Sequence, residues 1–383
     1  YNLVNGVYAN ENAHLVKDIL RGEWNYGGAV VTDWGGSNDY TEGVRAGCNL
    51  EMPGCGDDSA VQLIDAVKSG KIDEATVDQR VDELLELVMT TSAARHPSQI
   101  DFERHHKLAE RAAEESIVLL KNDNDVLPLA KDAKVAVIGD FASVPRFQGA
   151  GSSMVNAAKE DKTLDLLPDF FSHSIGYAPG FQRIDKEDEA LAAEAEALAA
   201  KADYVLLYLG LTEGYETEGL DRTHLRIPDN QIALLSRLRQ VNSHIIVVMT
   251  AGSAVEMPWL DQCEALVWAG LGGQAVAGAV LRVLTGDVNP SGKLAESFPI
   301  SYDETPVSQY YPGAEKTSEY RESLFVGYRC YQTANIPVRF PFGFGMSYTS
   351  FAYKNLTVTE QGAEFDLTNT GKCAGAEVSQ LYI

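Results

Sequence analysis

Two acidic segments, far apart in the sequence, carry the side chains best suited to chemistry. Asp33 follows the short apolar run 29–32 and precedes Trp34 and two glycines. Segment 212–222 holds three glutamates and two glycines and follows the apolar run 204–209. Glycoside hydrolysis needs two such carboxylates. One attacks the anomeric carbon, and the other protonates the leaving oxygen and later activates water.

Each segment also has a plain structural interpretation. Asp33 could cap a following helix, because aspartate is a preferred helix N-cap. Segment 212–222 could be a solvated acidic loop that Asp221 and Arg222 anchor. Both segments, however, lie at the carboxyl end of an apolar run, and the carboxyl ends of strands form the ligand-binding edge of barrels and open α/β sheets. The residue types alone leave these alternatives open.

Residues 1–91 alternate helix and strand patterns, which predicts the end of a (β/α)8-type barrel. We expect helices at 14–24, at 60–69 and after Asp73, and a short strand at 29–32. The apolar residues of the third helix are spaced along one face. Two βα units cannot close a barrel, so we expect an N-terminal barrel segment to be missing.

Residues 92–112 contain three histidines and several charges. They indicate a connector between domains that enters a helix. Without paired ligand spacing, we expect a solvated linker there and no metal site.

Residues 113–349 show a βαβα pattern, which predicts an α/β sandwich domain. Near-continuous apolar runs are typical of parallel strands covered on both faces. The expected strands are 135–138, 204–209, 245–249 and 265–268, and the expected helices are 187–201, 230–241 and 274–284. After residue 350 the pattern alternates as in strands, at 351–353, 356–358, 364–367 and 378–383, which predicts the beginning of a β-sandwich.

Composition narrows the class of partner. The chain has 383 residues, with 55 acidic against 31 basic side chains and a net charge of −24, which disfavours nucleic acid and anionic membranes. No apolar stretch approaches the roughly 18 residues of a membrane span. Five scattered cysteines favour free thiols in a reducing, cytoplasmic compartment, although Cys48 and Cys55 are close enough in sequence for a local bridge. The compartment is otherwise left open.

A series of motifs, in order along nearly the whole chain, strongly resembles glycoside hydrolase family 3. They are 1–6 (YNLVNG), 18–24 (DILRGEW), 28–34 (GAVVTDW), 51–54 (EMPG), 116–122 (SIVLLKN), 148–153 (QGAGSS), 216–222 (ETEGLDR), 255–259 (VEMPW), 289–294 (NPSGKL), 326–329 (VGYR) and 340–348 (FPFGFGMSY). The resemblance implies a β-glucosidase built from a barrel domain, an α/β sandwich and a fibronectin type III-like domain. The corresponding ranges here are 1–91, 113–349 and 350–383, the last being incomplete.

The resemblance also implies residue roles. Asp33 is the nucleophile and Trp34 a wall of the sugar subsite, which Tyr1 and Met52 also line. The acid/base is the glutamate of the Glu-Gly-x-Asp-Arg pattern, Glu218, with Glu216 as runner-up. Segment 148–153 is expected to be a structural loop or part of the pocket rim.

The implied reaction is retaining, exo-acting hydrolysis of terminal β-D-glucosyl residues from oligosaccharides or from aryl and alkyl glucosides, without cofactor or metal. The family's upstream sugar-binding residues are absent, so residues 1–383 alone are expected to be inactive or unfolded. A homo-oligomer is left open. Alternatives are a β-xylosidase, an N-acetylhexosaminidase, another β-glycosidase of the family, or a non-catalytic sugar-binding or assembly subunit.

Overall fold

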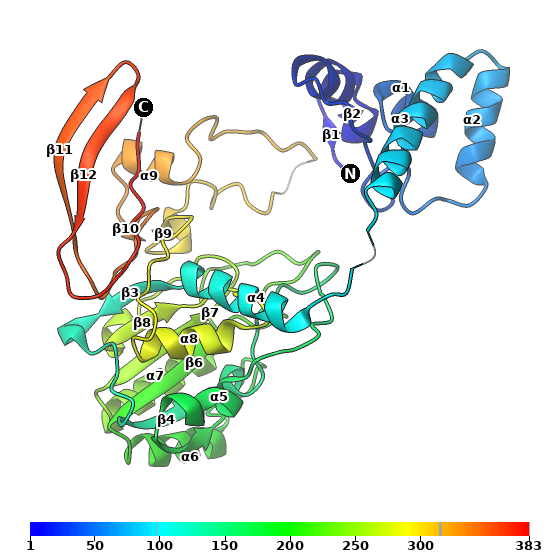
Figure 1. Ribbon diagram of the computed structural model, residues 1–383. Coiled ribbons are helices and arrows are strands. Elements are labelled where there is room, and N and C mark those ends of the chain that lie inside the picture. Colours follow the sequence, from blue (N-terminus) through cyan, green and yellow to red (C-terminus); the bar gives the residue numbers. More distant parts are fainter. Residues whose placement is uncertain (97, 314–315, 383) are drawn as a thin grey trace. The chain divides into compact units, whose positions relative to one another are not determined.

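The computed structural model describes residues 1–96, 98–313 and 316–382, and it divides into two units, Tyr1–Ile100 and Asp101–Ile383 (Figure 1). The division falls inside the predicted connector 92–112. The second half of the connector enters a helix, as expected: it belongs to α4 (Phe102–Ser116), which packs against α8 (Val276–Leu284). Because α4 buries His106, this half is not solvated throughout.

The first unit is mostly helical. Its elements are β1 (Leu3–Val4), β2 (Val7–Tyr8), the 3-10 turn η1 (Ala9–Glu11), the π-helix η2 (His14–Glu23), α1 (Tyr40–Ala46), α2 (Asp58–Lys68) and α3 (Glu74–Ala93). The three predicted helices are confirmed as η2, α2 and α3. Asp73 stands at the N-cap of α3, and α2 ends at Lys68, two residues before Gly70, whose φ is +71°.

One expectation for the first unit differs from the structure. The predicted strand 29–32 is reduced to one parallel bridge between Val31 and Leu50, because only segment 49–52 of the described residues pairs with it. The apolar face of α3 leaves Val81, Leu85 and Val88 exposed, and the buried side chain of this helix is Arg80. The assignment of this unit to part of a barrel stays a prediction.

A six-stranded sheet forms the centre of the second unit. Its strands are β3 (Val118–Asn122), β4 (Lys134–Ile138), β5 (His173–Ala178), β6 (Tyr204–Gly210), β7 (Ile245–Thr250) and β8 (Ala265–Trp268). They follow the order β3-β8-β7-β6-β4-β5, and all neighbours are parallel except β3 with β8. The four predicted strands are confirmed as β4, β6, β7 and β8. The two edge strands were not predicted.

Helices pack in two groups around this sheet. α5 (Thr163–Phe170) and α4 pack against α8 (Val276–Leu284), whereas α6 (Glu189–Ala199) packs against α7 (Asp229–Val241) (Figure 1). The predicted helices α6, α7 and α8 are confirmed. Helices on both faces explain why β6 and β7 are apolar and buried along almost their whole length.

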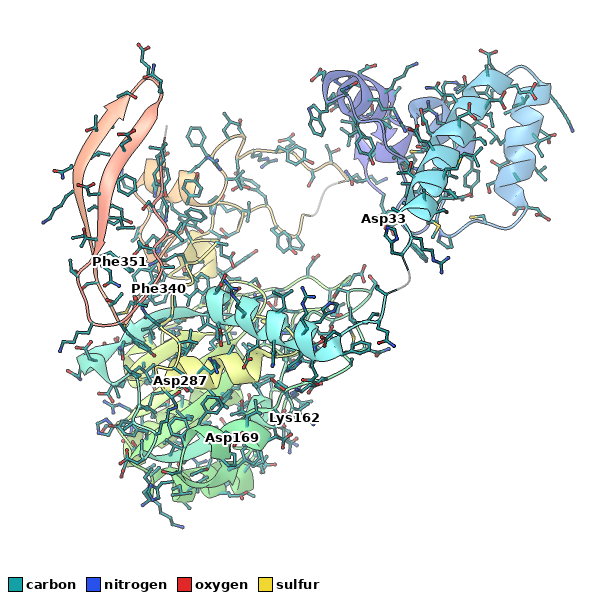
Figure 2. All side chains as sticks on the ribbon, viewed as in Figure 1. Asp33, Lys162, Asp169, Asp287, Phe340 and Phe351 are labelled. Atoms are coloured by element: carbon teal, nitrogen blue, oxygen red, sulfur yellow. The ribbon has the colours of Figure 1, made fainter. Side chains whose placement is uncertain are left out.

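The C-terminal part of the second unit is less regular. It contains β9 (Phe298–Pro299), the 3-10 turn η6 (Tyr302–Glu304), α9 (Tyr328–Ala334), β10 (Val338–Phe340), and the hairpin β11 (Phe351–Thr359) with β12 (Gly362–Asn369). Phe340 and Phe351, labelled in Figure 2, mark the end of β10 and the start of β11. The expected strands 351–353 and 356–358 are one bulged strand.

The expected strand 378–383 is not present over 378–382, since no described segment pairs with it; Ile383 lies outside the described residues. The membership of 350–383 in a fibronectin type III-like domain stays a prediction.

The order of the parallel strands places three loops at one edge of the sheet. In the sheet, β5 lies next to β4 on one side, and β6 followed by β7 lies on the other side of β4. The carboxyl ends of β4 and β6 therefore flank a topological switch point. Open α/β sheets bind ligands at such points. Gly139 ends β4 with a φ of +113°, and a Cβ there would lie 2.2 Å from the carbonyl oxygen of Tyr208 in β6. The loops after β4, β6 and β7 therefore start close together.

Candidate active site

Asp33 lies on an exposed turn of the first unit (Figure 2). Segments 30–35 and 49–52 run side by side, joined by the bonds from Asn49 N to Val30 O (2.8 Å) and from Thr32 N to Leu50 O (3.0 Å). After Thr32 the chain turns sharply, and Gly36 N donates to Asp33 O at 3.0 Å. The Oδ1 atom of Asp33 accepts from Trp34 N at 2.6 Å. The turn holds the carboxylate at the end of the paired segment.

The helix-cap interpretation of Asp33 is wrong. The next helix is α1, its N-cap is Asp39, and the Asp39 side chain accepts from Glu42 N at 3.1 Å. The position of Asp33 therefore needs another explanation than helix capping.

The other sugar-site residues expected in the first unit lie around the same turn. The Tyr1 hydroxyl donates to Trp34 O at 2.6 Å, and Gly35 N donates to Met52 O at 3.0 Å. Trp34 is 63% exposed. The structure thus brings together Asp33, Trp34, Tyr1 and Met52.

Asn49 supports this turn and was not recognised as important from the sequence. Its Oδ1 accepts from Val30 N and from Arg21 Nη2, both at 2.8 Å, and its Nδ2 donates to Glu83 Oε2 at 2.8 Å. These bonds join the segment that leads to Asp33 with η2 and α3. Nothing in the local sequence signals contacts that span 19 to 34 residues.

In the second unit, Glu218 lies on the loop after β6 and is exposed. Its Oε2 accepts hydrogen bonds from Ser152 N, at 2.7 Å, and from the Ser152 hydroxyl. Ser152 lies on the loop after β4. Gly151 has a φ of +89°, and a Cβ there would lie 2.6 Å from the Glu218 Cβ. Only glycine permits this close approach without a shift. The glycine-rich segment 148–153 therefore shapes the surroundings of Glu218.

Glu216, two residues earlier, has different surroundings. Its carboxylate accepts from Arg146 Nη1 at 2.7 Å, Gly252 N at 2.9 Å and the Ser253 hydroxyl at 2.8 Å. Only 13% of the Glu216 side chain and 1% of the Arg146 side chain are exposed. Both carboxylate oxygens are therefore occupied by donors from neighbouring loops.

The end of this segment is also held. Arg222 donates through Nη1 to Ser253 Oγ at 2.8 Å and lies 3.9 Å from Glu216 Oε1. Burial lowers the pKa of the Arg222 guanidinium below its ordinary value, and nearby glutamates partly oppose that effect. The Tyr311 hydroxyl donates to Asp221 Oδ1 at 2.6 Å, which raises the pKa of Tyr311. Asp221 and Arg222 anchor the segment as the sequence indicated.

The described residues contain no group of three His, Cys, Asp or Glu side chains that could hold a metal ion. Of the histidines in the predicted connector, His106 is buried between Asp161 Oδ2 (3.0 Å) and the side chain of Gln274 (2.9 Å). All five cysteines are free thiols, so Cys48 and Cys55 do not form a bridge. Among the described residues, no helix has both the length and the apolar character that crossing a bilayer requires.

Comparison with known domains identifies the family. Residues 117–348 match the glycosyl hydrolase family 3 C-terminal domain, and residues 1–87 match the glycosyl hydrolase family 3 N-terminal domain. The chain belongs to glycosyl hydrolase family 3, as its motifs indicated.

Three relatives illustrate the range of the similarity. The chain is 42% identical to thermostable β-glucosidase B of Acetivibrio thermocellus, over all of this chain and 52% of that protein. It is 39% identical to an exo-α-(1→6)-L-arabinopyranosidase of Bifidobacterium longum, over all of this chain and 53% of that protein. The crystal structure of a family 3 β-glucosidase from Bifidobacterium adolescentis aligns with a TM-score of 0.92 at 40% identity, over 97% of this chain and 56% of that one. The chain spans about half the length of the curated relatives it matches.

Proposed function

We propose that this chain carries the two catalytic carboxylates of a retaining, exo-acting β-glycosidase that releases terminal β-D-glucosyl residues. Asp33 is the nucleophile and Glu218 the acid/base, while Trp34, Tyr1 and Met52 line the sugar subsite. The observation that carries this proposal is that Asp33 stands on an exposed turn, is not a helix cap, and has the three expected sugar-site residues around it.

In the first step the Asp33 carboxylate attacks the anomeric carbon, and the glycosidic C–O bond breaks as Glu218 gives its proton to the leaving oxygen. A glycosyl ester of Asp33 results. In the second step Glu218, now a carboxylate, takes a proton from water, whose oxygen bonds to the anomeric carbon as the ester bond breaks. Two inversions give overall retention, which requires the two carboxyl groups to lie about 5–5.5 Å apart.

The surroundings of the two candidate acids support Glu218 over Glu216. An acid must hold a proton and reach a ligand. Glu216 is mostly buried, and its oxygens accept from Arg146, Gly252 and Ser253. Glu218 is exposed, on a loop at the carboxyl edge of the sheet.

The proposed substrates are short oligosaccharides and aryl or alkyl β-glucosides. Neutral sugars suit a chain whose net charge is −24, because they carry no charge for that field to repel. The two carboxylates suffice for the reaction without a metal or an organic cofactor.

We further propose that turnover requires barrel residues beyond these 383, since the relatives are about twice as long and α3 leaves apolar side chains uncovered. Residues 1–91 and 113–349 would then be the end of the barrel and the α/β sandwich, and 350–383 the start of a fibronectin type III-like domain.

A second candidate substrate is an α-L-arabinopyranoside, because a relative of that name is 39% identical to this chain. β-Xylosides and N-acetylglucosaminides are further candidate substrates. The remaining alternative is that the protein is a non-catalytic sugar-binding subunit. The 42% identity to a β-glucosidase supports glucosides as the first candidate.

A substrate panel tests the proposal. p-Nitrophenyl β-D-glucoside, β-D-xyloside, β-D-galactoside, N-acetyl-β-D-glucosaminide and α-L-arabinopyranoside are assayed with the 383-residue chain and with the chain joined to the additional barrel residues of a relative. We expect the joined form to hydrolyse the glucoside with the highest kcat/KM, and the chain alone to show little turnover. No hydrolysis of any of these substrates by a folded joined form would contradict the proposal.

A further inference from the structure

Glu216 lies at the centre of a buried polar network at the carboxyl edge of the sheet. Its partners come from all three loops described above: Arg146 from the loop after β4, Gly252 and Ser253 from the loop after β7, and Arg222 from its own loop. Arg146 also donates to Leu211 O at 2.7 Å and, through Nη2, to Glu216 O at 3.0 Å. Both the side chain and the backbone of Glu216 are therefore fixed.

Burial makes this network costly to disturb. The exposed fractions of the side chains are 1% for Arg146, 13% for Glu216 and 14% for Arg222. Removing one partner of a buried ion pair strands the other charge, which is strongly destabilising compared with the loss of an exposed pair. The segment can thus move little at Glu216 without breaking several bonds at once.

The network leaves the neighbouring acid exposed. Glu218 lies only two residues beyond Glu216, and its carboxylate meets a different loop residue, Ser152. The flanking glycines, Gly214 and Gly219, do not restrict the backbone. An acid must lie within hydrogen-bond reach of the leaving oxygen, and Glu216 gives the exposed Glu218 a fixed point two residues away.

We propose that Glu216 is a positioning residue, which tethers the Glu218 segment to the ends of β4 and β7 and so fixes the place of the proton donor. This inference rests on the proposed function. It separates the two glutamates by role: Glu218 transfers the proton, whereas Glu216 touches neither substrate nor reacting atoms and acts through the loop.

The choice of leaving group tests a positioning role. Departure of a poor leaving group, such as an alkoxide, depends on proton donation, whereas 2,4-dinitrophenolate leaves readily without it. A misplaced acid therefore slows the glycosylation step, which kcat/KM reports, selectively for alkyl glucosides. A general disturbance of the fold slows both classes by the same factor.

The variant is Glu216→Gln, in the form of the protein that turns over. The amide keeps the size of the side chain, but its NH2 group must face one of the donors Arg146, Gly252 or Ser253. We expect kcat/KM, which reports the glycosylation step, to fall about 10²-fold for an alkyl β-glucoside, the loss typical of an ångström-scale misplacement. We expect a much smaller loss of kcat/KM for 2,4-dinitrophenyl β-glucoside, whereas its kcat should also fall, because deglycosylation needs Glu218 as the base. The basic limb of the pH profile should be unchanged, because Glu218 is still the acid.

Glu213→Gln is the matched control. It makes the same chemical change in the same loop. Glu213, however, is exposed, and its carboxylate pairs with Arg183, at 3.2 Å, instead of with Arg146 or Arg222. We expect near-normal kcat for both substrates. If Glu216→Gln does not fold, Ser253→Ala removes one donor to Glu216 while keeping the charges, and should show the same selectivity to a smaller degree.

Equal losses of kcat/KM on both substrates, or no loss, in folded Glu216→Gln would overturn the inference. Formation of β-glucosyl azide by Glu216→Ala would overturn it in a different way, since Glu216 would then be the acid itself. Failure of the proposed function has another signature: Glu218→Ala would show neither leaving-group selectivity nor azide rescue.

Discussion

Alanine in place of Asp33 is expected to lower kcat for p-nitrophenyl β-glucoside by about 10⁴-fold or more, as removal of a covalent nucleophile does in other enzymes. Without the carboxylate, no glycosyl ester can form. The folded protein should be retained, because Asp33 is exposed and its carboxylate accepts from the neighbouring backbone atom Trp34 N. Steady-state kinetics and a thermal unfolding curve, recorded on the same preparation, check both expectations.

Asp39→Ala is the control for this substitution. Asp39 lies six residues after Asp33, in the segment that leads into α1. Its side chain caps α1 and pairs with Lys71 at 3.1 Å. Loss of an N-cap should cost about 1 kcal/mol of stability and leave kcat largely unchanged. Comparable activity losses in the two variants, or an active Asp33→Ala protein, would remove Asp33 from the mechanism.

The second large effect is expected at Glu218. Alanine there should lower kcat for substrates with poor leaving groups by about 10²- to 10⁴-fold, the usual contribution of general acid–base catalysis. Hydrolysis of 2,4-dinitrophenyl β-glucoside should fall mainly at deglycosylation, because water no longer has a base. Added azide needs no base, so it should restore turnover of this substrate and give β-glucosyl azide, detectable by NMR.

The anomeric configuration of that product is informative. A β-azide means that the nucleophile's ester formed first and was displaced from the opposite face, as the retaining mechanism requires. Glu213→Ala should give no azide product, because Glu213 is exposed and pairs with Arg183 rather than with the arginines that contact Glu216. An α-azide, or no rescue of Glu218→Ala, would count against the assignment of the acid/base.

The interior of the second unit could be predicted from sequence because one physical pattern governs it. Strands β6 and β7 are buried on both faces, so nearly every position is apolar and the run itself reveals the strand. The edge strand β5 (His173–Ala178) is largely exposed or half-buried and lacks that signal. Strand β3 pairs antiparallel at the other edge, and nothing in its sequence specifies this direction.

The candidate site was predictable as a set of carboxylates but not as a geometry. Glu216 and Glu218 have the same side chain and are two residues apart, so sequence alone cannot tell the tethered residue from the exposed one. Their difference arises from Arg146 and Ser152, which are 70 and 66 residues away, respectively. The role of Asn49 and the reduction of strand 29–32 to one bridge also depend on residues distant in sequence, so neither was predicted.

The separation of two carboxyl groups tests the central claim most directly. A crystal structure of the catalytically active protein with a bound glucoside analogue would measure the distance between the carboxyl groups of Asp33 and Glu218. A retaining pair should lie about 5–5.5 Å apart on either side of the glycosidic bond. A separation of about 6.5 Å or more, with water between the sugar and one carboxylate, would indicate inversion instead. Side chains that face different cavities would contradict the account altogether.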